Sequence, residues 1–379
     1  MSDLALLSLF VATPEQILAS RKRTFPHWGR GLTENQYLAR DAYLDIQEHA
    51  LDGKMTTWVL APRADPTTLD FKCACETYRR KALVRKEGSL SPEERISYGV
   101  ASVFTPPAKR KNGYAHHMMS LLHWVLAPRD ALSPFPASWG QPPPEVPGFG
   151  NASFSTLYSD VGEFYKIAGP AGADGGWVIR DPVATIWQVP KTNTPTILSG
   201  EGLRWLDEDG VEDIWKKDAE LMQLDMTSST SSKNLFTLLP HEGVGAFLIR
   251  RATFYLTGQP YKLPSKWGVC LSTPGASDMP QFTTWTLDVG STPTTLIFTR
   301  LRATPTSFLL FLDAIFEAAR ECGAERVEVW NLPKELEEYA HSQGGKTAIR
   351  DEHLNAFKWY GPERDEDIEW LFNEKFCWC

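Results

Sequence analysis

A basic segment that contains a glycine follows an apolar run in the first third of the chain. Val100 to Thr105 has the pattern of a strand, Pro106-Pro107 ends it, and Lys109 to Ala115 leads into an amphipathic stretch. The first N–H groups of a helix have no partner within the helix, and the helix dipole adds positive charge there. Gly113 allows the main chain to approach a ligand closely or to adopt a positive φ. This order of strand, basic turn and helix predicts a site for a pyrophosphate.

The best-known glycine motifs for phosphates do not occur in this sequence. There is no Gly-x-Gly-x-x-Gly and no glycine-rich loop that ends in Gly-Lys-Ser/Thr, which disfavours a dinucleotide fold and a P-loop. The segment therefore indicates a different phosphorylated ligand. An ordinary turn between a strand and a helix, with a basic surface patch, is the alternative, and the spacing alone leaves it open.

The segment resembles a motif of one enzyme superfamily. Arg110, Gly113 and Ala115 match the Arg-x-x-Gly-x-Gly/Ala loop that binds the pyrophosphate of acyl-CoA in the GNAT N-acetyltransferases. Residues 155–162, followed by Phe164-Tyr165, resemble the next strand and helix of that fold. This likeness covers roughly the first half of the chain.

A closer likeness rests on short matches spread over the whole length. Together with the blocks above, Cys75-Glu76-Thr77 and the segment Asn373 to Phe376 make the chain similar to the fungal lysine N6-acetyltransferases. Those enzymes acetylate free L-lysine in lysine breakdown. The resemblance implies acetyl-CoA as the co-substrate, L-lysine as the amine and no metal ion. The residues that it implies for acetyl-CoA are Val103, Phe104, Thr105, Lys109, Arg110, Lys111, Asn112, Gly113, Tyr114 and Ala115.

Acetyl transfer to an amine needs a base, because an ammonium group with a pKa of about 10.4 is almost fully protonated at neutral pH. Glu76 is the first candidate, since its strand is expected beside the strand that ends at Thr105, and Asp160 is the second. A charge at an exposed sheet edge is the alternative for Glu76. Tyr165 resembles the GNAT tyrosine that protonates the departing thiolate of CoA, and a buried structural aromatic is its alternative.

Free lysine also carries an α-carboxylate, which the planar fork of an arginine holds best. Arg250 and Arg251 follow an apolar, helix-like run, whereas Arg300 and Arg302 lie on a predicted strand. Any of the four could bind the carboxylate, and the sequence does not choose among them.

The order of predicted elements gives an α/β fold, with a GNAT-type mixed sheet flanked by helices and a second, degenerate GNAT-like domain. Capping boxes at Thr13 and Thr33 open two helices, the second reaching about Ala50. In the second half, Ser307 to Cys322 predicts a helix between two strands. There, Thr304-Pro305-Thr306 replaces the basic glycine loop, so we expect no second phosphate site.

The predicted divisions are residues 1–195 for the acetyltransferase domain, 196–232 for a helix and polar linker, and 233–379 for the C-terminal GNAT-like domain that completes the substrate pocket. Residues 127–151 hold seven prolines and almost no periodic pattern. Long loops inside compact domains are commonly functional. We therefore expect this loop to cover the substrate pocket, with a passive surface loop as the alternative.

The composition of the chain argues against some classes of binding partner. The formal net charge is −8, and an acidic surface argues against nucleic acid as the main partner. No apolar run is long enough to span a bilayer, and no basic segment precedes the first one, so we expect a soluble, cytoplasmic protein without membrane contact. The pairs Cys73/Cys75 and Cys377/Cys379 fit buried thiols in a reducing compartment, with a four-cysteine zinc site as the alternative.

Three functions follow from these observations. The leading hypothesis is an acetyl-CoA:L-lysine N6-acetyltransferase. The second is an N-acetyltransferase that acts on another amine, such as a protein lysine or a polyamine. The third is a catalytically silent acyl-CoA-binding protein, against which the matches at Arg110, Gly113, Ala115 and Tyr165 argue. The second domain and the proline-rich loop favour an enclosed pocket for a small molecule.

Overall fold

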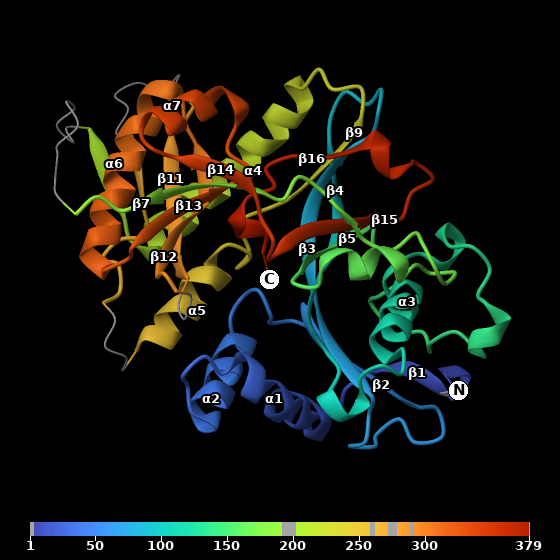
Figure 1. Ribbon diagram of the computed structural model, residues 1–379. Coiled ribbons are helices and arrows are strands. Elements are labelled where there is room, and N and C mark those ends of the chain that lie inside the picture. The colour runs from blue at the N-terminus through green and yellow to red at the C-terminus, as the bar shows by residue number, and fades with distance from the viewer. Residues whose placement is uncertain (1–3, 192–201, 258–261, 272–278, 289–291, 379) are drawn as a thin grey trace.

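The computed structural model describes residues 4–191, 202–257, 262–271, 279–288 and 292–378. Within these residues the chain forms two mixed sheets flanked by helices (Figure 1). The predicted fold class is confirmed.

The first sheet has nine strands among the described residues. Their order is β1-β2-β3-β4-β5-β15-β6, and β9 pairs with the far half of β3 and with β16. All pairs are antiparallel except β4 with β5 and β9 with β16. The strands are β1 (Leu7–Val11), β2 (Met55–Pro62), β3 (Cys73–Arg85), β4 (Glu93–Phe104), β5 (Phe154–Ser159), β6 (Val178–Ile179), β9 (Asn234–Leu238), β15 (Leu354–Trp359) and β16 (Ile368–Trp370).

The second sheet has seven described strands in the order β14-β7-β13-β12-β11-β10-β8, and only β12 and β13 are parallel. The strands are β7 (Val183–Gln188), β8 (Leu203–Leu206), β10 (Gly268–Leu271), β11 (Phe282–Asp288), β12 (Thr295–Arg302), β13 (Arg326–Trp330) and β14 (Lys346–Ile349). Strands from residues 354–370 thus complete the first sheet, while β7 belongs to the second. The division of the chain into domains at 195 and 232 stays a prediction.

The helices are α1 (Pro14–Trp28), α2 (Glu34–Asp45), α3 (Tyr114–Leu126), α4 (Glu208–Ser228), α5 (Ala246–Leu256), α6 (Pro305–Cys322) and α7 (Glu337–Ser342). Both predicted capping boxes are present, at Thr13 and Thr33. The second helix ends at Asp45 rather than near Ala50, because turns through residue 54 lead the chain into β2. None of the helices in the described part of the chain is long and apolar enough to cross a membrane.

Helix α3, the predicted amphipathic stretch, packs on the first sheet through one apolar stripe. Met118, Met119, Leu122 and Leu126 are fully buried in the core that this sheet shares with the helix. The loop at residues 127–151 adds its aromatic side chains to the same core. It contributes no residue to the cavity described below, and its role as a cover of the substrate pocket stays a prediction. Two of its aromatic rings pack edge-on against α3, Phe135 on Trp124 and Trp139 on His117.

Candidate active site

Strands β4 and β5 are parallel neighbours that separate before either strand ends. Their pairing stops at Val100 and Leu157, although β4 continues to Phe104. Ser102 adopts a positive φ of 55°, and the register between β3 and β4 shifts beside it. This bulge bends β4 away from β5. The main chain beyond Val100 is therefore not paired with β5 and can meet a ligand between the two strands.

The N-terminus of α3 lies directly after this opening. Gly113 is the N-cap residue, with φ 75°, and no side chain caps the first turn. The amides of Tyr114 and Ala115 are thus left to a ligand or to solvent. A Cβ built on Gly113 would meet only Leu4, at 3.8 Å, so the glycine is needed for its positive φ and not for lack of space.

The basic side chains of the loop divide into two groups. The Lys109 ammonium donates hydrogen bonds to the main-chain carbonyls of Asp70 and Phe71, both at 2.9 Å, and pairs with the Asp70 carboxylate. It therefore fixes the loop to the segment before β3. Arg110 donates through Nε to the carbonyl of Thr105 at 3.1 Å and is otherwise exposed, as is Lys111. These two cations remain available to phosphate oxygens.

The other predicted cofactor residues have mixed surroundings. The Asn112 amide donates to the carbonyl of Lys109 at 3.1 Å and so shapes the turn. Phe104 is buried against the ring of Trp28, Val103 packs partly buried on the core, and the Thr105 hydroxyl donates to Cys73 Sγ at 3.1 Å. An uncapped helix start, a positive-φ glycine, two exposed cations and an open strand edge together fit the diphosphate and thioester arm of an acyl-CoA.

A cavity of about 240 Å³ lies beside the bulge, slightly below the range of about 300–1,000 Å³ that is usual for ligand pockets. Helices α1 and α2 form one wall and β3 and β4 another, while α5, β2, β5 and the segments around Asp160, His353 and Trp378 also contribute. The predicted base candidates Glu76 and Asp160 both line it, as does Arg251. The residues that line it are Ser20, Arg21, Thr24, Trp28, Arg30, Tyr37, Arg40, Asp41, Leu44, Asp45, Thr57, Cys75, Glu76, Tyr78, Val100, Ala101, Ser102, Tyr158, Asp160, Phe247, Arg251, His353 and Trp378.

Glu76 lies at the point where the cavity meets the bulge. Its Oε2 atom accepts hydrogen bonds from the hydroxyls of Ser102, at 2.7 Å, and Tyr78, at 3.2 Å. No described residue donates to Oε1. Burial raises the pKa of Glu76 above its ordinary value, and the charge of Arg21 and the Ser102 hydrogen bond only partly oppose this. A carboxylate with a raised pKa is a stronger proton acceptor.

Asp160 has a different environment. Its Oδ1 atom accepts a hydrogen bond from the main-chain N–H of His353 at 2.7 Å and lies 3.0 Å from the imidazole Nδ1. Burial favours its neutral form, but the hydrogen bonds and charge of His353 outweigh this and lower the pKa of Asp160. Its side chain is 58 % exposed. This carboxylate links β5 to the segment before β15.

Tyr165 follows β5 and packs, partly buried, on the core that α3 shares with the first sheet. Its segment, Gly162–Ile167, is a 3₁₀ helix rather than the expected α-helix, and the ring packs edge-on against Trp177. Burial raises the pKa of the Tyr165 phenol, and the nearby thiols of Cys73 and Cys75 add to this. Its hydroxyl is therefore protonated at neutral pH.

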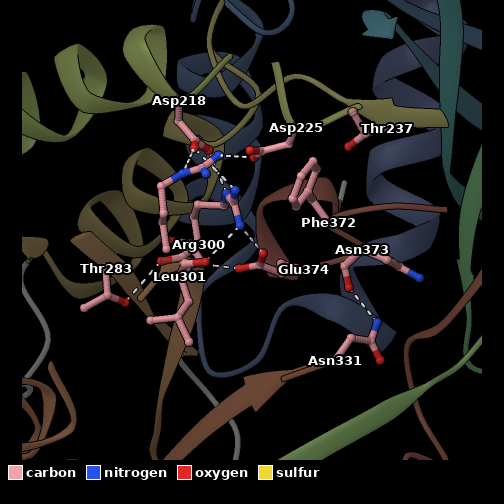
Figure 2. Close-up of polar contacts among 12 residues, drawn as sticks. Asp218, Asp225, Thr237, Thr283, Arg300, Leu301, Asn331, Phe372, Asn373 and Glu374 are labelled. Carbon is pink, nitrogen blue, oxygen red and sulfur yellow. Dashed lines mark hydrogen bonds and ion pairs between the residues drawn. The ribbon is translucent and has the colours of Figure 1, made fainter. Parts of the chain in front are cut away.

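The second sheet repeats this topology without the anion site. Strand β12, helix α6 and strand β13 correspond in order to β4, α3 and β5, but Thr304 caps α6 through a capping box with Ser307. The opening between β12 and β13 holds the C-terminal segment instead (Figure 2): Leu301 N–H donates to Glu374 at 2.7 Å, and Asn331 donates to the Asn373 carbonyl at 2.6 Å. In place of the glycine loop, the side chain of Thr304 caps the first turn of α6.

Sequence reasoning missed most of the cavity wall. Arg21, Asp41 and Asp45 come from α1 and α2, and Arg21 pairs with Asp45 at 2.7 Å and with Asp41 at 3.8 Å. Trp378 comes from the other end of the chain. The capping boxes predicted these helices, but nothing local indicated which face meets β3. Cys379 lies outside the described residues.

Comparison of the sequence with known proteins gives a match to a family model and a match to one curated protein. Residues 187–379 match the family model described as LYC1 GNAT-like C-terminal domain. A curated protein of Yarrowia lipolytica named "Lysine acetyltransferase" is 28% identical over 163 residues, and the match spans 43% of this chain and 40% of that protein.

Two solved structures share the fold over most of the chain. A probable N-acyltransferase from Enterococcus faecalis V583 has a TM-score of 0.56 at 10% identity, covering 94% of this chain and 72% of that one. A GCN5-related N-acetyltransferase from Anabaena variabilis has a TM-score of 0.53 at 11% identity, covering 94% and 73%. At these identities the likeness concerns the fold alone. Because the family model covers more than half of the chain, and the fold agrees, this protein belongs to the LYC1-like family of the GNAT superfamily.

Proposed function

We propose that this protein transfers the acetyl group of acetyl-CoA to the ε-amine of free L-lysine. The observation that carries the proposal is that one structural element serves both sites. The bulge at Ser102 opens the strand edge toward the acyl-CoA site and also hydrogen-bonds Glu76 in the cavity. A small cavity of about 240 Å³ suits a single amino acid better than a peptide. The name of the Yarrowia relative, "Lysine acetyltransferase", agrees with this substrate.

In this proposal the start of α3 binds the diphosphate. The first-turn amides and the exposed side chains of Arg110 and Lys111 supply its donors. Lys109 and Asn112 hold the loop in shape, and the main chain around Val103 and Thr105 receives the pantetheine arm and the thioester oxygen. Acetyl-CoA supplies the activated acyl group when it is bound.

The transfer forms a bond between the ε-nitrogen and the acyl carbon and breaks the bond from that carbon to sulfur. The ammonium first has to lose a proton, and Glu76 accepts it directly or through a water molecule. Burial raises the pKa of this carboxylate, which makes it a better base than Asp160, whose pKa is lowered. Tyr165 then donates its phenolic proton to the departing thiolate, and the second proton that the nitrogen loses as the amide forms restores the phenol.

The direct test is thiol release from acetyl-CoA in the presence of different amines. We expect release with L-lysine, and N6-acetyl-L-lysine as the product by mass spectrometry. Faster release with a polyamine or a histone peptide would instead identify the second candidate function. Acetyl-CoA binding without release for any amine would identify a silent acyl-CoA-binding protein.

A further inference from the structure

Four arginines are candidates for holding a substrate carboxylate, and the structure separates them. Arg250 pairs with Glu208 at 3.0 Å and with Glu212 at 3.4 Å, on the surface beside α4. It does not line the cavity. Its charge is therefore already balanced, away from any substrate.

The two arginines of β12 are also paired, and Figure 2 shows Arg300 among its partners. Arg302 bonds Asp218 and Asp225, both at 2.8 Å. Arg300 is buried, bonds Asp218 at 2.7 Å and pairs with Glu374. Both side chains hold α4 to the second sheet, Arg300 also holds the C-terminal segment through Glu374, and neither lines the cavity.

Arg251 differs from the other three. It projects from α5 into the cavity, where its guanidinium lies 5.2 Å from the ring centre of Trp378. No described carboxylate lies within ion-pairing distance of it. The nearest acidic groups are engaged elsewhere: Asp288 pairs with Arg30 at 3.7 Å, and Asp41 pairs with Arg40 at 2.6 Å.

The pKa of Arg251 agrees with the lack of a carboxylate beside it. Burial, together with the like charge of Arg40, lowers the pKa of Arg251 to about 10. A cation that has lost water without gaining an anion is unfavourable, and an incoming carboxylate removes that cost. The planar guanidinium can hold both carboxylate oxygens at once.

We propose that Arg251 binds the α-carboxylate of the amine substrate and so makes this site select an amino acid over a diamine. This inference rests on the proposed function. Glu76 on β3 and Arg251 on α5 line the same cavity from different elements, so a substrate held by its carboxylate at Arg251 presents its distant amine to Glu76. Selection then depends on the group at the far end of the substrate from the reacting nitrogen.

The test compares L-lysine with cadaverine, the diamine of the same chain length without the carboxylate. The variant is Arg251→Gln, and the matched control is Arg250→Gln, which changes the adjacent residue outside the cavity. We expect Arg251→Gln to raise KM for L-lysine by roughly 10- to 100-fold, because charged hydrogen bonds are lost, and to leave KM for cadaverine nearly unchanged. Arg250→Gln should keep the wild-type ratio of the two KM values. Arg251→Lys should lie between wild type and Arg251→Gln.

Two measurements keep the result decisive. Acetyl-CoA titration and thermal unfolding show whether each variant is folded. A folded Arg251→Gln protein that still prefers L-lysine by the wild-type factor would overturn the role of Arg251 while leaving the proposed function intact. A wild-type protein that releases thiol with cadaverine but not with L-lysine would overturn the proposed function and this inference together.

Discussion

The hydroxyl of Ser102 donates a hydrogen bond of 2.7 Å to Oε2 of Glu76. In the proposed mechanism it joins the strand edge for the acyl group to the carboxylate that accepts the proton of the amine. Because Oε1 has no donor among the described residues, one oxygen of Glu76 is fixed and the other can accept a proton.

Replacing Glu76 with glutamine keeps the shape of the side chain but removes the base. We expect Glu76→Gln to lower kcat by roughly 100-fold or more, with little change in acetyl-CoA affinity, because base catalysis contributes about that much. Asp160→Asn is the comparison and should have a smaller effect. Equal losses in both variants would contradict the assignment of the base.

The pH dependence of kcat follows from the direction of the Glu76 shift. Burial raises its pKa, and only the carboxylate form accepts a proton. At saturating L-lysine, kcat should therefore fall as the pH drops through a value above the ordinary pKa of about 4.3. The substrate ammonium has a pKa of about 10.4. The fall in kcat at low pH therefore reports a group of the enzyme and not the substrate. This fall should disappear in the residual activity of Glu76→Gln.

The positive φ of Gly113 predicts a specific loss of acyl-CoA affinity. A valine there would force the start of α3 to change, and we expect Gly113→Val to weaken acetyl-CoA binding by at least tenfold in calorimetry. Gly88 has the same φ of 75° in the turn between β3 and β4, and a Cβ there would meet no atom within 4 Å. Gly88→Val should thus lose comparable stability but keep its affinity for acetyl-CoA. If both variants bind equally well, the site does not use the start of α3.

Tyr165 is expected to act on the leaving thiolate and not on binding. Tyr165→Phe should lower kcat by roughly tenfold or more and leave the Kd for acetyl-CoA unchanged. The control is Tyr339→Phe, because Tyr339 is exposed on α7. Near-normal turnover in Tyr165→Phe would remove this residue from the mechanism.

The ion pair between Arg300 and Glu374 predicts a large effect on stability. Glutamine removes the charged acceptor that Glu374 offers to Arg300 and to the Leu301 N–H, although Arg300 keeps Asp218; losing a hydrogen bond to a charged group costs about 1.5–3 kcal/mol. We expect Glu374→Gln to lower the free energy of unfolding in urea by a change of that order. Asp213→Asn, which breaks an exposed pair with Lys216, should cost less than about 1 kcal/mol. Similar midpoints for the two variants would contradict the structural role of Glu374.

Local patterns predicted the elements better than their ends. The capping boxes at Thr13 and Thr33 identified α1 and α2, because an N-cap is a property of four neighbouring residues. The end of α2 at Asp45 and the 3₁₀ form of residues 162–167 were not predicted, since a helix end depends on what the following residues contact. A positive φ at Gly113 was one of two roles expected from its neighbours alone, and the structure shows it.

The cavity could be predicted only in part. Glu76 and Asp160 were identified as candidates, and both line it, but their different surroundings depend on Arg21 and His353, which are distant in sequence. The choice of Arg251 among four arginines depends on which carboxylates lie beside the other three. Such long-range pairings carry no local signal in one sequence.

Because Trp378 is part of the cavity wall, the residues of the bulge and those of this wall are synthesised at very different times. Strand β4, the bulge and the start of α3 are complete within the first 126 residues, whereas the wall beside Arg251 waits for a segment about 250 residues later. A ribosome that stopped between these points would release a chain that has the bulge and the start of α3 but lacks the Trp378 side of the cavity wall.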